Sequence, residues 1–234
     1  MEPNLRRSNS DGELLKNPAS YRRLIGRLMC LTISGLDITY AVSSLSQFLS
    51  QSRTAHLYAL HHLLRYIRGT VGQDLLFSTN SEKRLMAYVD ADLAGCPNTR
   101  RSITRFCVFI GDSLVAWRSK KQTTVSRSFA ESEYRAMAAA TAELTWLKGL
   151  LFDFQIDVPF SMLFCDSQST IHIASNPTFH ERTKHIEVDC HFVREKVDAE
   201  FIKLIHVRTQ HQLADVFTKL VTQLNSTISF PNLA

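Results

Sequence analysis

Two short apolar runs in this sequence each lead directly into an aspartate, the first at Asp90 and the second at Asp166. Aspartate is disfavoured within strands, so an acid at such a place usually forms a turn or a cap. The repetition favours a second interpretation, because Glu133 and Asp215 add acids from two helical patterns. Acids from separate elements that meet at one place repel one another unless they bind cations. The sequence therefore predicts a carboxylate cluster that holds metal.

The hydrophobic pattern from residue 84 onward predicts a mixed α/β sheet in the order βββ-α-β-α-α-β-α. The expected strands cover about 84–90, 103–110, 114–118, 162–165 and 201–207. The expected helices cover about 128–151, with Ser128 as the N-cap, 170–174, 184–199 and 213–220. Helical crossovers favour parallel pairing of the first and fourth strands, and ligand sites in such sheets lie beyond the carboxyl ends of parallel strands. This topology brings Asp90 and Asp166 together.

The chain divides by pattern into four segments. Residues 1–19 are polar and are expected to form a disordered lead-in. Residues 20–80 carry three one-sided helical stripes, with Ser20, Asp37 and Thr54 as candidate N-caps. Residues 81–221 hold the strands and their helices, and residues 222–234 form a polar tail that we expect to be flexible.

Basic residues are concentrated between positions 100 and 127, where seven of them face only Asp112, whereas the whole chain has a net charge of +5. A concentrated basic surface is typical of phosphate binding, and a solvated hairpin tip is the alternative. The candidate nucleic-acid-binding residues are Arg100, Arg101, Arg118, Lys120, Lys121 and Arg127.

The composition excludes several other classes of protein. No apolar run approaches the length of a membrane span, and the N-terminus lacks the apolar core of a signal peptide, so we expect an intracellular protein, cytoplasmic or nuclear. The five cysteines are scattered without a CxxC pair, which argues against a zinc ribbon or a disulfide framework.

The predicted cluster consists of carboxylates without histidine or cysteine. Hard oxygen ligands of this kind select Mg²⁺, with Mn²⁺ as a possible substitute. Two such ions held about 4 Å apart can activate water and stabilise the leaving oxygen of a phosphodiester. A basic surface beside the cluster would bind the polyanion, so the combination predicts metal-dependent phosphodiester hydrolysis.

Seven motifs, in order along the chain, resemble the ribonuclease H domain of copia-type LTR retrotransposon Pol polyproteins. They are YVDADLAGC (88–96), RRS (100–102), SKKQ (119–122), SRSFAESEY (126–134), CDSQ (165–168), HERTKHIE (180–187) and QLADVFTK (212–219). Two helical motifs, YRRLIGR (21–27) and LRYIRGT (64–70), are similar to the thumb-to-connection region that precedes this domain in reverse transcriptases. The resemblance covers about residues 10–220.

The resemblance implies a ribonuclease H-like five-stranded mixed sheet flanked by helices and preceded by a small three-helix segment. It implies cleavage of the RNA strand of RNA–DNA hybrids with two Mg²⁺ ions. The implied catalytic and metal-binding acids are Asp90, Glu133, Asp166 and Asp215. Glu131 stays open as an alternative to Glu133, and Asp92 has a secondary place beside the site. The family's histidine before the last acid matches neither His206 nor His211 well; His211 is the candidate, and an ordinary exposed histidine is the alternative.

The chain also departs from the family pattern. It lacks the paired-aspartate motif of the polymerase and the upstream reverse transcriptase domains, so no polymerase activity is expected. Leu93, Arg105 and Phe129 stand where the family commonly has Trp, Gly and Ser. Arg105 is the largest change, since a long charged side chain replaces a residue without one. A second hypothesis follows: an inactive fragment of a decayed retrotransposon, at most a nucleic-acid-binding module.

Overall fold

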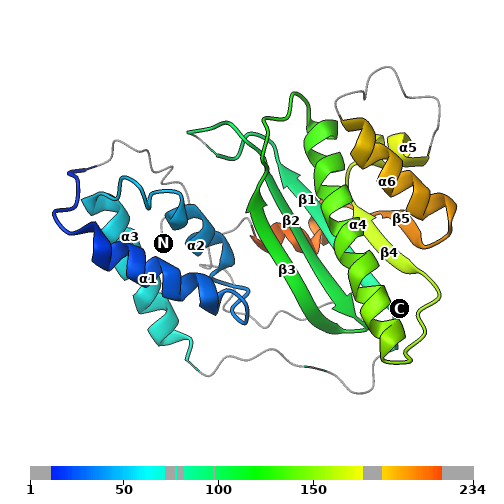
Figure 1. The fold of residues 1–234 in the computed structure, drawn as a ribbon, viewed down its shortest axis with the longest axis horizontal. Helices are drawn as coiled ribbons and strands as arrows, with labels where there is room; N and C mark the ends of the chain where they lie inside the picture. Colours follow the sequence, from blue (N-terminus) through cyan, green and yellow to red (C-terminus); the bar gives the residue numbers. More distant parts are fainter. Residues whose placement is uncertain (1–11, 72–76, 78–81, 97, 176–185, 218–234) are drawn as a thin grey trace. The chain divides into compact units, whose positions relative to one another are not determined.

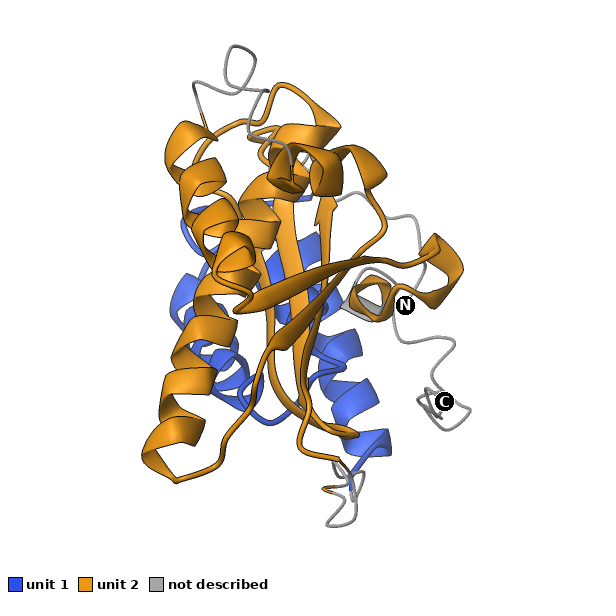
Figure 2. Ribbon diagram, turned by 90° about the vertical axis from the view of Figure 1, so that its right-hand side faces the viewer, with its two compact units in different colours: residues 1–75, 216–234 blue, residues 76–215 orange. Residues whose placement is uncertain are grey.

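The computed structural model describes residues 12–71, 77, 82–96, 98–175 and 186–217. The chain divides into two compact units, residues 1–75 with 216–234 and residues 76–215 (Figure 2). Each unit has its own cluster of buried apolar side chains, and no residue is shared between the two clusters. Residues 1–11, most of the 72–81 connection and residues 218–234 lie outside the described part, and so do the predictions made for them.

The first unit contains three helices, as the sequence predicts. They are α1 (Pro18–Leu31), α2 (Thr39–Ser46) and α3 (Thr54–Gly69). The hydroxyl of Tyr21 is buried in this unit and donates a hydrogen bond to the carbonyl of Leu45 at 2.9 Å, which ties α1 to α2.

The expected N-caps of these helices are wrong. Asn17 caps α1, because its Oδ1 accepts a hydrogen bond from Ala19 and Pro18 fixes the first helical turn. Asp37 does not cap α2; it accepts a hydrogen bond from the hydroxyl of Tyr66. At α3 the cap position is Arg53, one residue before Thr54. Only the change at Asp37 comes from a tertiary partner, since Tyr66 is 29 positions away, whereas the caps of α1 and α3 are formed by residues next to those helices.

The second unit is built on a five-stranded sheet in the order β3-β2-β1-β4-β5 (Figure 1). β1 pairs antiparallel with β2, and β2 pairs antiparallel with β3. β4 pairs parallel with both β1 and β5. The strands are β1 (Leu85–Asp92), β2 (Ile103–Ile110), β3 (Ser113–Lys121), β4 (Ser161–Cys165) and β5 (Ile202–His206). The mixed sheet expected from the sequence is confirmed, and β1 and β4 are parallel neighbours as predicted.

Two strands run further than their patterns predict. β1 continues past Asp90 to Asp92, so Asp90 is not the strand's last residue. β3 extends to Lys121. Both extensions come from pairing with β2, since Ile103 at the start of β2 aligns with Asp92 on one side and Lys121 on the other. Backbone pairing therefore holds charged residues in strands that their side chains would not favour.

The helices of this unit pack against the sheet and against one another. They are α4 (Phe129–Asp153), α5 (Gln168–Ser175), α6 (Glu187–Asp198) and the 3₁₀ helices η3 (Thr209–His211) and η4 (Leu213–Phe217). Ser128 caps α4 as expected, with its side chain accepting a hydrogen bond from the backbone of Glu131. The predicted α-helix over 213–220 is wrong in type, because residues 213–217 form a 3₁₀ helix and the remainder lies outside the described residues.

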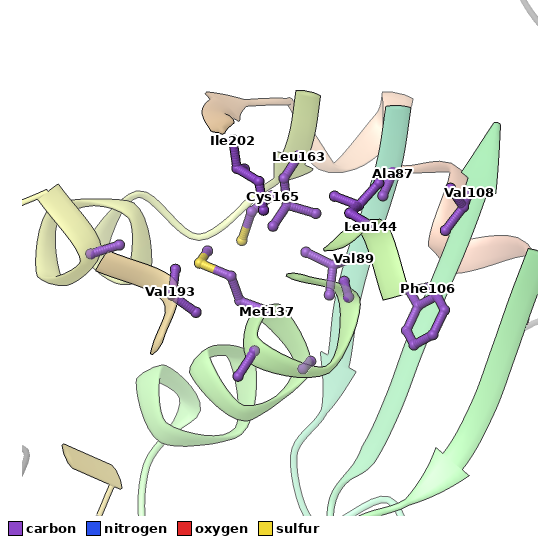
Figure 3. Packing of buried hydrophobic residues seen from close by; sticks show 14 of the residues in the cluster. Ala87, Val89, Phe106, Val108, Met137, Leu144, Leu163, Cys165, Val193 and Ile202 are labelled. Atoms are coloured by element: carbon purple, nitrogen blue, oxygen red, sulfur yellow. The ribbon is translucent and has the colours of Figure 1, made fainter. Parts of the chain in front are cut away.

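Apolar side chains of the sheet and of the helices fill the core of this unit. Ala87 and Val89 of β1 and Phe106 of β2 face Met137 and Leu144 of α4 (Figure 3). The strand period of two directs the alternate residues of β1 to the other face of the sheet, where Tyr88 stacks on Phe164 with ring centroids 4.6 Å apart. Asp90 follows the same alternation as Tyr88. Among the described residues, no helix combines the length and apolar character that a membrane span requires.

Candidate active site

Asp90 and Asp92 lie on one face of β1, because they are two positions apart and side chains alternate between the faces of a strand. Arg105 of β2 is the cross-strand partner of Asp90 and shares that face. Its Nη1 donates to Asp90 Oδ2 at 3.1 Å and its Nη2 donates to Asp92 Oδ2 at 2.9 Å. One guanidinium thus bridges both aspartates.

Glu133 projects from the first half of α4 toward the same end of β1. Its Oε1 accepts a hydrogen bond from the backbone N–H of Ala91 at 3.2 Å. The residue is 6% exposed. Burial, reinforced by the charges of Asp90 and Asp166, raises the pKa of Glu133 to about 8. A positive charge nearby would stabilise the charged form of this carboxyl group, which makes Glu133 a candidate functional residue.

Asp166 follows β4 directly. Its Oδ2 accepts a hydrogen bond from the hydroxyl of Thr209 on η3 at 3.0 Å. One ligand atom each from Glu133, Cys165 and Asp166 lies within 4.8 Å of the others. Burial raises the pKa of the Cys165 thiol to about 12. A soft sulfur is a poor ligand for a hard cation, so the two carboxylates are the candidate ligands.

Asp215 reaches the site from η4. The segment is anchored by Gln212, whose Nε2 donates to the carbonyl of Val89 at 2.9 Å and whose Oε1 accepts from the N–H of Ala214. Asp215 lies near enough to Asp90 for its charge to affect the pKa of that residue. Burial is the main cause that raises the pKa of Asp90, Arg105 opposes it, and the charges of Asp215 and Asp166 add to it. The structure therefore brings Asp90, Glu133, Asp166 and Asp215 within electrostatic reach.

The donor set fits a divalent cation in part. Oε2 of Glu133 is buried and has no hydrogen-bond partner in the described part of the chain, so it is an oxygen available for a cation. Carboxylate oxygens are the donors that Mg²⁺ and Mn²⁺ prefer. The Oδ2 atom of Asp90, in contrast, is already paired with Arg105.

The structure separates the two glutamates that the sequence left open. Both carboxylate oxygens of Glu131 have partners at the start of α4. Its Oε2 accepts a hydrogen bond from the N–H of Arg127 at 2.7 Å, and its Oε1 pairs with Arg135 at 2.8 Å. Glu133 is the one placed beside Asp166. The role of Glu133 as a ligand remains a prediction, now with geometric support.

Neither candidate histidine has a contact with the carboxylates among the interactions found. His211 lies on η3 with an exposed side chain, and its Nε2 is 3.1 Å from Nε2 of Gln210. His206 is the exposed last residue of β5. A catalytic role for His211 stays a prediction.

The predicted nucleic-acid-binding residues lie on β3 and on the loops at its end of the sheet. Arg100, Arg118, Lys120 and Arg127 are exposed, whereas Arg101 and Lys121 are half-buried. Lys121 Nζ is 3.7 Å from Cys96 Sγ, so its ammonium is held within the protein. Their role in binding stays a prediction.

The positioning residues were missed by the sequence reasoning. Thr209 and Gln212 hold two of the acids through contacts that span 43 and 123 positions of the chain. Only the Gln212-Leu-Ala-Asp215 motif gave a signal, and it indicated the acid rather than the glutamine. The sequence did mark Arg105 as an unusual residue. Its pairing with Asp90 could not be predicted, because that pairing depends on the register of β1 with β2.

No family model matches this chain. The Pol polyprotein of transposon RE1 from Arabidopsis thaliana is 37% identical over 220 residues, which are 94% of this chain and 15% of that protein. Pol polyproteins of two further plant transposons match at similar identity. The chain thus spans less than a fifth of the length of these relatives, at 15% to 16%.

Two solved structures resemble the fold. The foamy viral protease-reverse transcriptase in complex with dsDNA aligns with a TM-score of 0.51 at 13% identity, over 82% of this chain and 38% of that chain. The N-terminal ribonuclease H domain of a Mycobacterium tuberculosis protein aligns with a TM-score of 0.42 at 14% identity, over 57% of this chain and 89% of that chain.

The second unit thus has the five-stranded mixed sheet with flanking helices that the sequence predicted for a ribonuclease H-like fold. The homologues that cover 90% or more of this chain are copia-type retrotransposon Pol polyproteins, and the chain corresponds to one segment of them.

Proposed function

We propose that this chain hydrolyses the RNA strand of RNA–DNA hybrids with divalent cations, as the ribonuclease H part of a retrotransposon Pol polyprotein. The observation that carries the proposal is the buried carboxylate of Glu133, within reach of the charges of Asp90 and Asp166. Its Oε2 has no hydrogen-bond partner in the part of the chain that the structure describes. Carboxylates held together in a buried site repel one another, and a bound cation would offset that repulsion. The resemblance of the motifs to ribonuclease H domains supports the hybrid as substrate.

In this proposal the four acids hold the cations, and neighbouring groups orient the acids. Mg²⁺ ions, when bound by Asp90, Glu133, Asp166 and Asp215, would supply an activated water and stabilise the leaving oxygen. The N–H of Ala91 orients Glu133, and the hydroxyl of Thr209 orients Asp166. Exposed basic side chains such as Arg118 and Lys120 would bind phosphates of the substrate.

The test is cleavage of a labelled RNA–DNA hybrid by the purified chain in Mg²⁺, beside an Asp166→Asn variant. Asparagine keeps an oxygen that can accept the hydrogen bond of Thr209 but loses the charge. We expect RNA-strand cleavage by the wild type and only background with the variant. Equal cleavage in both samples would point to a contaminating nuclease and against the proposal.

A second candidate is hybrid binding without cleavage. The ion pair between Arg105 and Asp90 favours it, because that carboxylate already has a cationic partner. In the same experiment this candidate predicts no wild-type cleavage, with retained hybrid binding that weakens as salt rises. Binding lost together with cleavage would exclude both candidates.

A further inference from the structure

The bridge between Arg105 and the two aspartates is fixed by the sheet. Asp90 and Arg105 are directly opposite in the antiparallel pairing of β1 with β2, and Asp92 is the next residue of β1 on that face. The two contacts, 3.1 Å to Asp90 and 2.9 Å to Asp92, use different nitrogens of one planar group. A guanidinium can bridge two carboxylates in this way, whereas a lysine ammonium is a single point of charge.

The bridge is largely withdrawn from water. The side chain of Arg105 is 4% exposed and that of Asp90 is 13% exposed, while Asp92 at 41% lies at the rim. Arginine stays charged in proteins, so this position always carries a positive charge. Removing one partner of a buried pair leaves an uncompensated charge, which makes the pair hard to separate.

The same positive charge acts on the rest of the cluster. Arg105 lowers the cost of ionising both Asp90 and Glu133, although burial outweighs it in each case. A divalent ion at Asp90 would compete with the guanidinium for the same carboxylate and would meet a like charge at short range. Glu133 Oε2 is one of the buried oxygens that have no hydrogen-bond partner among the described residues.

We propose that Arg105 is an internal counter-cation of this site, which holds Asp90 and Asp92 and opposes the binding of a divalent cation at Asp90. The inference rests on the proposed function, because it assumes that these carboxylates bind divalent cations. It concerns how that cation binding is regulated. It implies weak cation binding by the wild type and tighter binding when the guanidinium charge is removed.

The test measures cation binding by the full chain without nucleic acid, by electron paramagnetic resonance of free Mn²⁺ and by calorimetry with Mg²⁺. Arg105→Gln removes the charge and keeps a polar side chain; Arg105→Lys keeps the charge. Arg135→Gln is the matched control, because Arg135 pairs with Glu131 and the net charge changes equally. We expect Arg105→Gln to bind Mn²⁺ at least about tenfold more tightly than the wild type, and the control to differ by less than about threefold.

Two results would overturn the proposal: equal Mn²⁺ affinity for Arg105→Gln and Arg135→Gln, or tighter binding by Arg105→Lys than by Arg105→Gln. If Arg105→Gln does not fold in metal-free buffer, the proposal requires Mn²⁺ to restore its native circular dichroism, since the ion would replace the lost charge. Failure of that rescue counts against it. Absence of hybrid cleavage by the wild type bears on the proposed function alone, because this measurement contains no substrate.

Discussion

At the scale of single residues, the site is defined by carboxyl groups held where ionisation is costly. Glu133 is the clearest case, since burial first and the charges of Asp90 and Asp166 second raise its pKa to about 8. The backbone N–H of Ala91 stabilises the charged form but does not offset the burial. Its folded pKa therefore lies above the unfolded value, which has a consequence for stability.

Glu133 should make the metal-free protein less stable as pH rises. The native state retains a proton on this group between about pH 4.5 and about pH 8, whereas the unfolded chain releases it, so the free energy of unfolding falls across that window. The slope from one group is at most about 1.4 kcal/mol per pH unit. We expect Glu133→Gln to remove this fall, as measured by urea denaturation in a chelating buffer at pH 5, 6, 7 and 8.

Glu143→Gln is the control for this measurement, since it removes a carboxyl group of α4 and keeps Glu133. The fall in stability should persist in that variant. A Glu133→Gln protein that loses stability with pH as steeply as the wild type would refute the assigned burial cost.

At the scale of elements, the last acid depends on a short segment rather than on a regular helix. Asp215 lies on η4, and five residues of 3₁₀ helix have little stability of their own. Gln212, which is 4% exposed, connects this segment to the carbonyl of Val89 on β1. The glutamine therefore acts as the anchor of the segment.

Gln212→Ala should lower the free energy of unfolding by about 1–3 kcal/mol, because it leaves a buried carbonyl and the Ala214 N–H without this partner. Amide exchange of residues 209–217 should rise as the segment loosens. Gln210→Ala is the matched control, since Gln210 is exposed and its side chain contacts the neighbouring exposed His211. Its effect should stay within about 0.5 kcal/mol. Similar losses in both variants would mean that Gln212 is no anchor.

The sequence predicted elements well where a local pattern determines them. The apolar faces of α4 and β2 follow their helical and strand periods, and Ser128 caps α4 as expected. Prediction from the sequence failed where a residue distant along the chain determines the bounds or the cap of an element. Asp92 and Lys121 belong to strands because β2 pairs with both, and Asp37 bonds Tyr66 instead of capping α2.

The same division holds for the candidate site. The strand-associated acids and the helix acids were identifiable from their places in the pattern and from the resemblance. The resemblance favoured Glu133 over Glu131, and the structure supports that preference, because Glu133 lies beside Asp166 whereas Glu131 pairs with Arg135 one turn along the same helix. The pairing of Arg105 with Asp90 needed the structure, since a shift of the strand register by one residue would turn the guanidinium to the other face.

At the scale of the whole molecule, the two compact units have separate cores. The buried cluster of the first unit draws on residues between Tyr21 and Leu63, and that of the second on residues between Leu85 and Ile202. A unit whose buried apolar residues all come from its own stretch of chain can fold without the rest. The sequence-based boundaries, 20–80 and 81–221, remain a prediction that this separation supports.

A polypeptide of residues 81–221 should therefore fold by itself and unfold in one cooperative transition. Its far-ultraviolet circular dichroism should show mixed helix and strand, and its thermal midpoint should lie within about 5 °C of one transition of the full chain. Residues 81–199 form the matched control, because they lack β5, which pairs with β4, and the segment that carries Gln212 and Asp215. That shorter polypeptide should lose the cooperative transition, since one edge of β4 and the buried side of Leu163 would be exposed. A non-cooperative 81–221 polypeptide would instead mean that the fold which positions the carboxylates requires the first unit.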